Sequence, residues 1–238
     1  YNSAKTLPQC LRALREHLPC RRLIAVDHCS TDNTQEILTK YGAEVYEEDQ
    51  GLGYARTLQI KLAETDPFII IDSDVVVQQG ICAWLGHVLS EFSRDDHLGG
   101  YVGCPSLEAQ YFAHFWRRLM PKLLDRNFTL HFTVLRKASL TKADIPPHLQ
   151  AAEDYAIMQS VLRAGYRLHS SPAPIKHLGQ HQTIKTGLYA GANFRLASRT
   201  PTEAVTLFVW KGLLHPVKLI PFMVATRNSD VTIDHLKY

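Results

Sequence analysis

The hydrophobic pattern of the first hundred residues alternates between helical and strand-like segments. Leucines from Leu7 to Leu18 recur at helical spacing between Thr6, which can cap a helix, and Pro19, which ends it. The other predicted elements are strands at 22–27, 43–49 and 67–72 and helices at 30–42, 51–65 and 80–92. The strand segments are nearly all apolar, as expected for strands that are covered on both faces. This order predicts βαβ units in an α/β domain, with a mostly parallel, open sheet flanked by helices.

Beyond residue 98 the pattern is less regular. The predicted elements there are a strand and turn at 132–140, an amphipathic helix at 153–166, and a short strand with a loop at 167–179. No internal repeat and no low-complexity linker divides the chain. The sequence therefore predicts that these later elements complete the same domain.

Composition narrows the functional classes. The chain has 238 residues, 21% of them charged, and a net charge of +3, so no basic field on the scale of a nucleic-acid-binding protein is implied. Its five cysteines form no CxxC pair, which favours reduced thiols in the cytoplasm over a disulfide framework or a zinc site. The sequence shows no signal peptide and no apolar run of about 18 residues. It opens on Tyr1 rather than on Met, and we expect it to be a piece of a longer protein.

Two of the apolar strands end in aspartate. LIAVD ends at Asp27, and FIIID ends at Asp72, with Asp74 two residues later. Ligands of an open parallel sheet bind at the carboxyl ends of its strands, so these acids are expected at one crevice. Carboxylate oxygens suit Mg²⁺ or Mn²⁺, and such an ion can hold a diphosphate and neutralise a leaving group. Each acid alone could instead belong to a turn or a helix cap, but two acidic strand ends together favour the metal and diphosphate site.

A further acidic pair opens the helix at 153–166. Glu153 and Asp154 lie where the helix macrodipole stabilises negative charge, which is a sufficient structural reason for their presence. The functional alternative is a general base that takes the proton of an acceptor hydroxyl. Asp154 at the helix tip would be kept ionised, as a base requires.

Taken in order, five motifs resemble those of the family 2 inverting glycosyltransferases, which have the GT-A fold. The motifs are YN…CLRAL, IAVDHCSTDNTQEIL, GLGYARTLQI, IIIDSDVVV and EDYAIMQSVLRAGYRL, and they span about residues 1–180. The resemblance implies transfer of a sugar from a nucleotide-sugar donor to an acceptor hydroxyl, with inversion of the anomeric carbon. It also implies a role in the synthesis of cell-envelope polysaccharide, glycolipid or polyprenyl-linked glycan.

The resemblance assigns roles to the strand-end acids. Asp27 would contact the base or ribose of the nucleotide, Asp72 would face the nucleotide, and Asp74 would bind Mg²⁺ or Mn²⁺. His28 stands where many members of the family carry a second acid.

Other positions follow from the same motifs. Glu153 and Asp154 match the family's acidic pair, with Asp154 as the base. Arg56 matches an arginine near the diphosphate, although Thr57 replaces the usual asparagine. His177 matches a histidine near the diphosphate or the metal, and His181 is the alternative.

The start of the chain matches the end of the family's first strand. That strand normally leads into a PTYN-like turn, so Tyr1 and Asn2 would border the nucleotide pocket. The strand itself, a central member of the sheet, is expected to be missing from these residues.

We expect a GT-A domain with a nucleotide-sugar half at 1–100 and an acceptor half at 101–200, followed by an apolar helical segment at 201–238. Within that segment, residues 203–226 carry three basic side chains on one helical face and two interrupting prolines; these are Lys211, His215, Lys218, Pro216 and Pro221. This pattern is compatible with a helix at the membrane surface or with a core helix. The lipid-linked acceptors that the resemblance implies favour the helix at the membrane surface. The expected location is the cytoplasm, peripheral on the cytoplasmic face of the membrane.

Two other functions are compatible with the strand-end acids. A sugar-1-phosphate nucleotidyltransferase also places a metal-binding acid there, but the acidic pair at 153–154 disfavours it. A non-catalytic nucleotide-sugar-binding protein is the second alternative. The leading expectation is a metal-dependent hexosyltransferase-like enzyme with a nucleotide-sugar donor, a carbohydrate or lipid-linked acceptor and no nucleic-acid partner.

Overall fold

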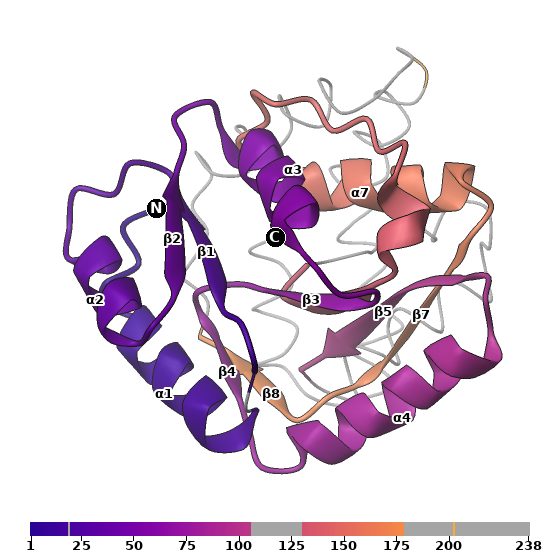
Figure 1. Ribbon diagram of the computed structural model, residues 1–238, viewed down its shortest axis with the longest axis horizontal. Coiled ribbons are helices and arrows are strands. Elements are labelled where there is room, and N and C mark those ends of the chain that lie inside the picture. Colours follow the sequence, from indigo (N-terminus) through magenta and orange to yellow (C-terminus); the bar gives the residue numbers. More distant parts are fainter. Residues whose placement is uncertain (19, 106–129, 179–201, 203–238) are drawn as a thin grey trace, which may run out of the picture.

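The computed structural model describes residues 1–18, 20–105, 130–178 and 202 of the chain (Figure 1). Its helices are α1 (Leu7–His17), α2 (Thr34–Lys40), α3 (Leu52–Leu62), α4 (Ile81–Arg94) and α7 (Glu153–Arg163), with a short 3₁₀ helix η1 (Lys137–Leu140). Its strands are β1 (Ile24–Asp27), β2 (Glu44–Glu47), β3 (Phe68–Ile71), β4 (Val75–Val77), β5 (Leu98–Cys104), β6 (Phe132–Leu135), β7 (Arg167–Pro172) and β8 (Ile175–His177). The predicted α/β class is confirmed.

Three strands, β4, β5 and β8, were absent from the sequence prediction, and β8 lies where a loop was expected. β4 is only three valines long and follows directly on the acids, so its pattern merges with that of β3. β5 contains Gly99, Gly100 and Gly103, which lower its resemblance to a strand. These glycines are needed because of close packing, since a Cβ on Gly99 would lie 2.6 Å from side-chain atoms of both Tyr166 and Val161. The glycines make β5 difficult to recognise as a strand in the sequence. Because they have no side chain, they also let β5 pack closely against Tyr166 and Val161.

The described strands pair in both directions, rather than mostly in parallel. β1 pairs with β2 and β5 with β7 in parallel, whereas β3 with β6, β5 with β6, and β4 with β8 are antiparallel. The largest described sheet has the order β3-β6-β5-β7. β6 therefore lies between β3 and β5, and it brings residues near 131 alongside the end of β3.

The described sheets separate between β1 and β3. β1 and β2 form a sheet of their own, and among the described residues no strand lies between β1 and β3 (Figure 1). A cleft of about 630 Å³ occupies this place, and apolar side chains of α1 and β1, among them Leu11, Leu14 and Ala25, line one part of it. The strand-end acids lie in the polar part of the same cleft.

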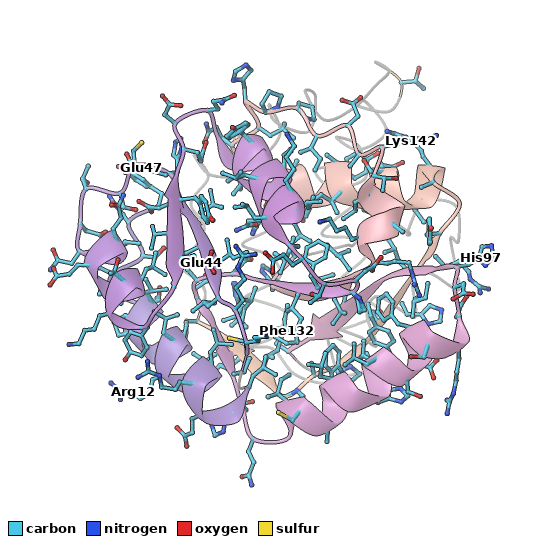
Figure 2. All side chains as sticks on the ribbon, in the orientation of Figure 1. Arg12, Glu44, Glu47, His97, Phe132 and Lys142 are labelled. Atoms are coloured by element: carbon cyan, nitrogen blue, oxygen red, sulfur yellow. The ribbon has the colours of Figure 1, made fainter. Side chains whose placement is uncertain are left out.

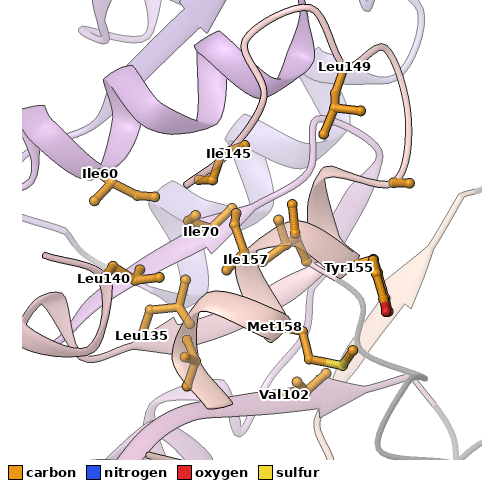
Figure 3. Close-up of a cluster of buried hydrophobic side chains, with 14 of the residues drawn as sticks. Ile60, Ile70, Val102, Leu135, Leu140, Ile145, Leu149, Tyr155, Ile157 and Met158 are labelled. Carbon is orange, nitrogen blue, oxygen red and sulfur yellow. The ribbon is translucent and has the colours of Figure 1, made fainter. Parts of the chain in front are cut away.

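Apolar packing holds the four-stranded sheet from both faces. α7 buries Ile157 and Met158 against β3, β5 and β6 (Figure 3), and α4 buries Val88 and Phe92 on the other face. Phe132, at the start of β6, is fully buried in the interior (Figure 2). All four residues of β6 are buried, so a one-residue slip of this strand would exchange its two packed faces. The core thus fixes the register that places the site.

Candidate active site

Asp27 ends β1 and is almost fully buried, with 1% of its surface exposed. Its carboxylate accepts hydrogen bonds from the Ser30 backbone N–H (2.9 Å), the Ser30 hydroxyl (2.5 Å) and the Gln35 amide (2.9 Å). Burial alone would raise the pKa of Asp27, but these donors outweigh it and lower the pKa below its ordinary value. Asp27 is therefore an ionised acceptor that lines the cleft.

Tyr1 and Asn2 also line the cleft, as the sequence predicts. Asn2 adopts a left-handed backbone (φ 47°), and its side-chain oxygen accepts the backbone N–H of Thr31 at 2.9 Å. Tyr1 is 67% exposed, and its ring meets the edge of the His28 ring at a centroid distance of 6.1 Å. Asn2 thus joins the chain start to the loop after β1, and Tyr1 remains open to a ligand.

His28, in the loop after β1, pairs with Glu48, which follows β2, and the sequence analysis did not single out this pair. The side chain of Glu48 has no exposed surface, and its Oε1 lies 2.7 Å from Nδ1 of His28. Its other oxygen accepts the backbone N–H groups of Gln50 and Gly51. His28 is therefore held in a fixed orientation beside Tyr1 and Asp27. The sequence signal that could have revealed this pair was Glu48, an acid at the end of the predicted strand 43–49.

Asp72 follows β3, and its carboxylate binds Arg56 and His131 at the same time. Its Oδ1 lies 2.6 Å from Arg56 Nη2, and its Oδ2 lies 2.9 Å from His131 Nδ1. Burial would raise the pKa of Asp72, but Arg56 and His131 outweigh it and hold the pKa well below its usual range. Burial likewise would lower the pKa of His131, but the bond to Asp72 raises it. Asp72 is thus a carboxylate with both oxygens engaged.

Arg56, on α3, is a buried cation between two acids. Its side chain is 8% exposed, and besides Asp72 it lies 3.6 Å from Glu153 Oε1. Within the described part of the chain its Nε atom is buried without a hydrogen-bond partner. The structure therefore places Arg56 in the cleft, as predicted, with one end of the guanidinium already bound to carboxylates.

Asp74 and His177 meet at the end of the cleft. The antiparallel pairing of β4 with β8 sets Val75 opposite His177, and His177 Nε2 lies 3.3 Å from Asp74 Oδ1. This separation suits two ligands of one ion, and the carboxylate of Asp74 suits Mn²⁺ or Mg²⁺. Among the described residues no group of three His, Cys, Asp or Glu side chains could hold a metal ion. Asp74 and His177 would thus supply two ligands, and diphosphate and water would complete the shell, as is usual for such ions at phosphates.

Glu153 and Asp154 begin α7 after a left-handed Ala152 (φ 64°). Glu153 is 8% exposed and lines the cleft, and burial raises its pKa to about 7 in spite of the neighbouring Arg56. Asp154 Oδ1 accepts the backbone N–H of Tyr155 at 2.7 Å. The structure thus brings Glu153 together with Arg56 and Asp72, and Asp154 is the next residue on the helix tip.

His131 belongs to this site and was not predicted from the sequence. It lines the cleft, bonds to Asp72 and packs against His177 with ring centroids 4.2 Å apart. No local motif marks it, because it meets Asp72 only through the antiparallel β3–β6 pairing, 59 residues away. The predicted alternative, His181, and the apolar segment 203–226 lie outside the described residues. Among the described residues, no helix is long and apolar enough to cross a membrane.

A model of glycosyl transferase family 2 matches residues 1–151, which include Asp27, Arg56, Asp72, Asp74 and His131. The chain belongs to glycosyl transferase family 2. The matched range covers more than half of the chain and stops two residues before Glu153. No curated protein matches the sequence.

Solved glycosyltransferases share the fold of this family 2 chain. The mannosyltransferase PcManGT from Pyrobaculum calidifontis, solved with GDP-Man and Mn²⁺, superposes with a TM-score of 0.66 at 17% identity, over 94% of this chain and 71% of its own. Glucosyl-3-phosphoglycerate synthase from Mycobacterium tuberculosis, solved with Mn²⁺, UDP and glucosyl-3-phosphoglycerate, gives a TM-score of 0.60 at 16% identity, over 84% of this chain and 77% of its own. These similarities confirm the predicted GT-A fold.

Proposed function

We propose that this family 2 glycosyltransferase moves a sugar from a nucleotide-sugar donor to an acceptor hydroxyl, with inversion of the anomeric carbon. The observation that carries the proposal is the convergence of Asp27, Asp72 and Asp74 on one cleft. Asp72 is held ionised by Arg56, and Asp74 lies 3.3 Å from His177. This is an arrangement that can bind both a nucleoside and a metal-held diphosphate.

The donor would lie along the cleft from Asp27 to Asp74. Asp27 and Asp72 would accept hydrogen bonds from the nucleoside, with Tyr1 and Asn2 at its border. Asp74 and His177 would hold Mn²⁺ or Mg²⁺, which supplies positive charge to the diphosphate leaving group. The solved mannosyltransferase and synthase carry Mn²⁺ with GDP-Man and UDP, which supports a nucleotide-sugar donor with Mn²⁺.

The acceptor would be activated at the tip of α7. Asp154 would take the proton of the attacking hydroxyl, because the helix N-terminus keeps a carboxylate ionised. In an inverting reaction this base lies on the face of the sugar opposite the leaving diphosphate. Glu153, buried beside Arg56, would fix the neighbouring wall of the cleft.

The acceptor class rests on the sequence. A carbohydrate or lipid-linked acceptor in cell-envelope glycan synthesis is proposed from the family resemblance. The basic and apolar segment 203–226 supports contact with the cytoplasmic surface of a membrane.

Donor binding can be tested by thermal unfolding of the purified protein with UDP, GDP or dTDP, with and without Mn²⁺. A ligand at about 100 times its Kd adds roughly 2.7 kcal/mol to the free energy of unfolding. We expect a Mn²⁺-dependent rise in Tm with one nucleotide, and its loss in Asp74→Asn. The matched control is Asp96→Asn, an exposed aspartate remote from the cleft, which should keep the full shift.

The product released identifies the reaction. Incubation with the sugar nucleotide of the stabilising base and Mn²⁺ should release nucleoside diphosphate. Release of pyrophosphate would instead indicate a nucleotidyltransferase, and binding without turnover in the presence of acceptor extracts would indicate a binding protein. If the protein is folded and no nucleotide shifts its Tm, the proposed donor site is wrong, and Asp27, Asp72 and Asp74 have structural roles only.

A further inference from the structure

His131 occupies the cleft because of strand pairing rather than because of a local motif. The β3–β6 ladder pairs Ile71 with Phe132, so the next opposed pair is Asp72 with His131. The backbone continues this pairing, since the Asp72 N–H donates to the His131 carbonyl at 3.1 Å. The buried side chains of β6 fix the register, and the register fixes His131 opposite the first acid of the Asp72-Ser73-Asp74 motif.

The imidazole of His131 completes the restraint on Asp72. Arg56 binds one carboxylate oxygen at 2.6 Å, and His131 Nδ1 binds the other at 2.9 Å. Because Asp72 is an ionised acceptor, the proton of this bond belongs to Nδ1 of His131. With both oxygens bound from different elements, the carboxylate cannot rotate about its Cβ–Cγ bond without losing one partner.

The other contact of the ring is with the proposed metal ligand. The rings of His131 and His177 lie with centroids 4.2 Å apart and planes at 40°. The His177 side chain is 19% exposed and reaches Asp74 at 3.3 Å. The His131 ring therefore limits the rotation of His177 away from Asp74. Among the described residues, the His131 ring thus touches both the first acid of the motif and the proposed metal ligand.

We propose that His131 is a positioning residue that joins the nucleoside-binding acid Asp72 to the metal-binding pair Asp74 and His177. Its Nδ1–H orients Asp72, and its ring face supports His177. This inference rests on the function proposed above and adds to it a residue that neither the motifs nor the family resemblance marks. Outer partners of metal ligands commonly change metal affinity or activity by about 10- to 100-fold when they are removed.

Two substitutions separate the two contacts. His131→Phe keeps a ring against His177 but removes the donor to Asp72. His131→Asn keeps a donor close to the position of Nδ1 but removes most of the ring. His87→Asn, on the exposed side of α4, is the matched control.

Each variant should weaken a different binding constant. We would measure the Kd of Mn²⁺ by electron paramagnetic resonance, and the Kd of UDP and GDP by calorimetry at saturating Mn²⁺. We expect His131→Phe to weaken binding of the preferred nucleotide by about 10-fold with little change for Mn²⁺. We expect His131→Asn to show the reverse, with Mn²⁺ binding weaker by about 10-fold. The control should match the native protein in both constants.

The same data separate the two levels of inference. If the native protein binds Mn²⁺ and one nucleotide, but both variants weaken both constants equally or change neither, the positioning role of His131 is wrong and the proposed function stands. If the native protein binds neither nucleotide in the presence of Mn²⁺, the proposed function is wrong, and the role of His131 falls with it. Thermal unfolding of each variant shows that a weaker constant is not caused by unfolded protein.

Discussion

At the scale of single residues, the site concentrates opposite charges in a partly closed cleft. Arg56 is shared between Asp72 and Glu153 at 2.6 Å and 3.6 Å. Asp72 takes the closer contact and stays ionised, whereas burial leaves Glu153 with a pKa of about 7. Asp72 and Glu153 face the same guanidinium but differ in charge state near neutral pH. Asp72 has a second donor, His131, which helps to keep it ionised. For Glu153, the attraction of Arg56 does not offset the cost of burying a negative charge.

Glu153 should make stability depend on pH. Its pKa in the folded protein is about 7, above the ordinary 4.5, so the folded state holds this proton more tightly than the unfolded chain does. The free energy of unfolding should therefore fall as the pH rises from about 4.5 through about 7. Glu153→Gln stays neutral, and relative to the native protein it should gain up to about 3 kcal/mol over this interval.

Urea denaturation of both proteins at pH 4.5, 6 and 8 would measure this difference. The same change at the exposed Glu36 is the control for replacing a surface carboxylate by an amide. A Glu153→Gln difference that does not grow with pH would contradict the assignment of a buried, weakly acidic carboxyl.

At the scale of elements, the loop before α7 is built onto the start of α3. The Gly53 and Tyr54 backbone N–H groups donate to the carbonyls of Leu149 and Pro147 at 2.9 Å and 3.0 Å. These bonds satisfy the free N–H groups of the first helical turn and bring the two backbones close together. The loop then runs directly into Ala152 and Glu153, so α3 carries Arg56 and also positions its acidic partner.

Gly53→Ala should break this contact. A Cβ on Gly53 would lie 2.0 Å from the Pro146 carbonyl oxygen, so the loop must move away from α3. We expect a loss of at least about 2 kcal/mol in the free energy of unfolding. Gly86→Ala on α4 is the matched control, since nothing lies within 4 Å of its Cβ position and the substitution should gain about 0.5–1 kcal/mol. Equal effects of the two substitutions, measured by urea denaturation, would contradict the close packing at Gly53.

The elements were largely predictable, but the contacts between them were not. The strands at Asp27 and Asp72 and the helix at Glu153 follow from apolar runs and caps, which are local signals. His131 and the β4–β8 pairing depend on antiparallel neighbours distant in sequence, and no local pattern encodes register. β5 was missed because its three glycines serve packing rather than strand propensity. The roles of Asp74, Asp154 and His177 in catalysis stay predictions.

At the scale of the whole molecule, the sheet of β1 and β2 is less well enclosed than the four-stranded sheet β3-β6-β5-β7. β6 pairs with β3 and β5 and is buried at every position, whereas β1 pairs only with β2 among the described strands and faces the cleft. We expect backbone amides of β6 to exchange with deuterium orders of magnitude more slowly than the amides of β1 that do not bond to β2. Exchange followed by mass spectrometry would measure this, and equal protection of the two strands would contradict the separation between β1 and β3.

The opposition of Asp72 and His131 also bears on how such a chain can diverge. Strand pairing, not nearness in sequence, sets where His131 lies. A single inserted residue within β3 or β6 would turn one partner to the other face of the sheet. The Asp72–His131 pair therefore depends on the number of residues within β3 and β6 being kept as the sequence changes.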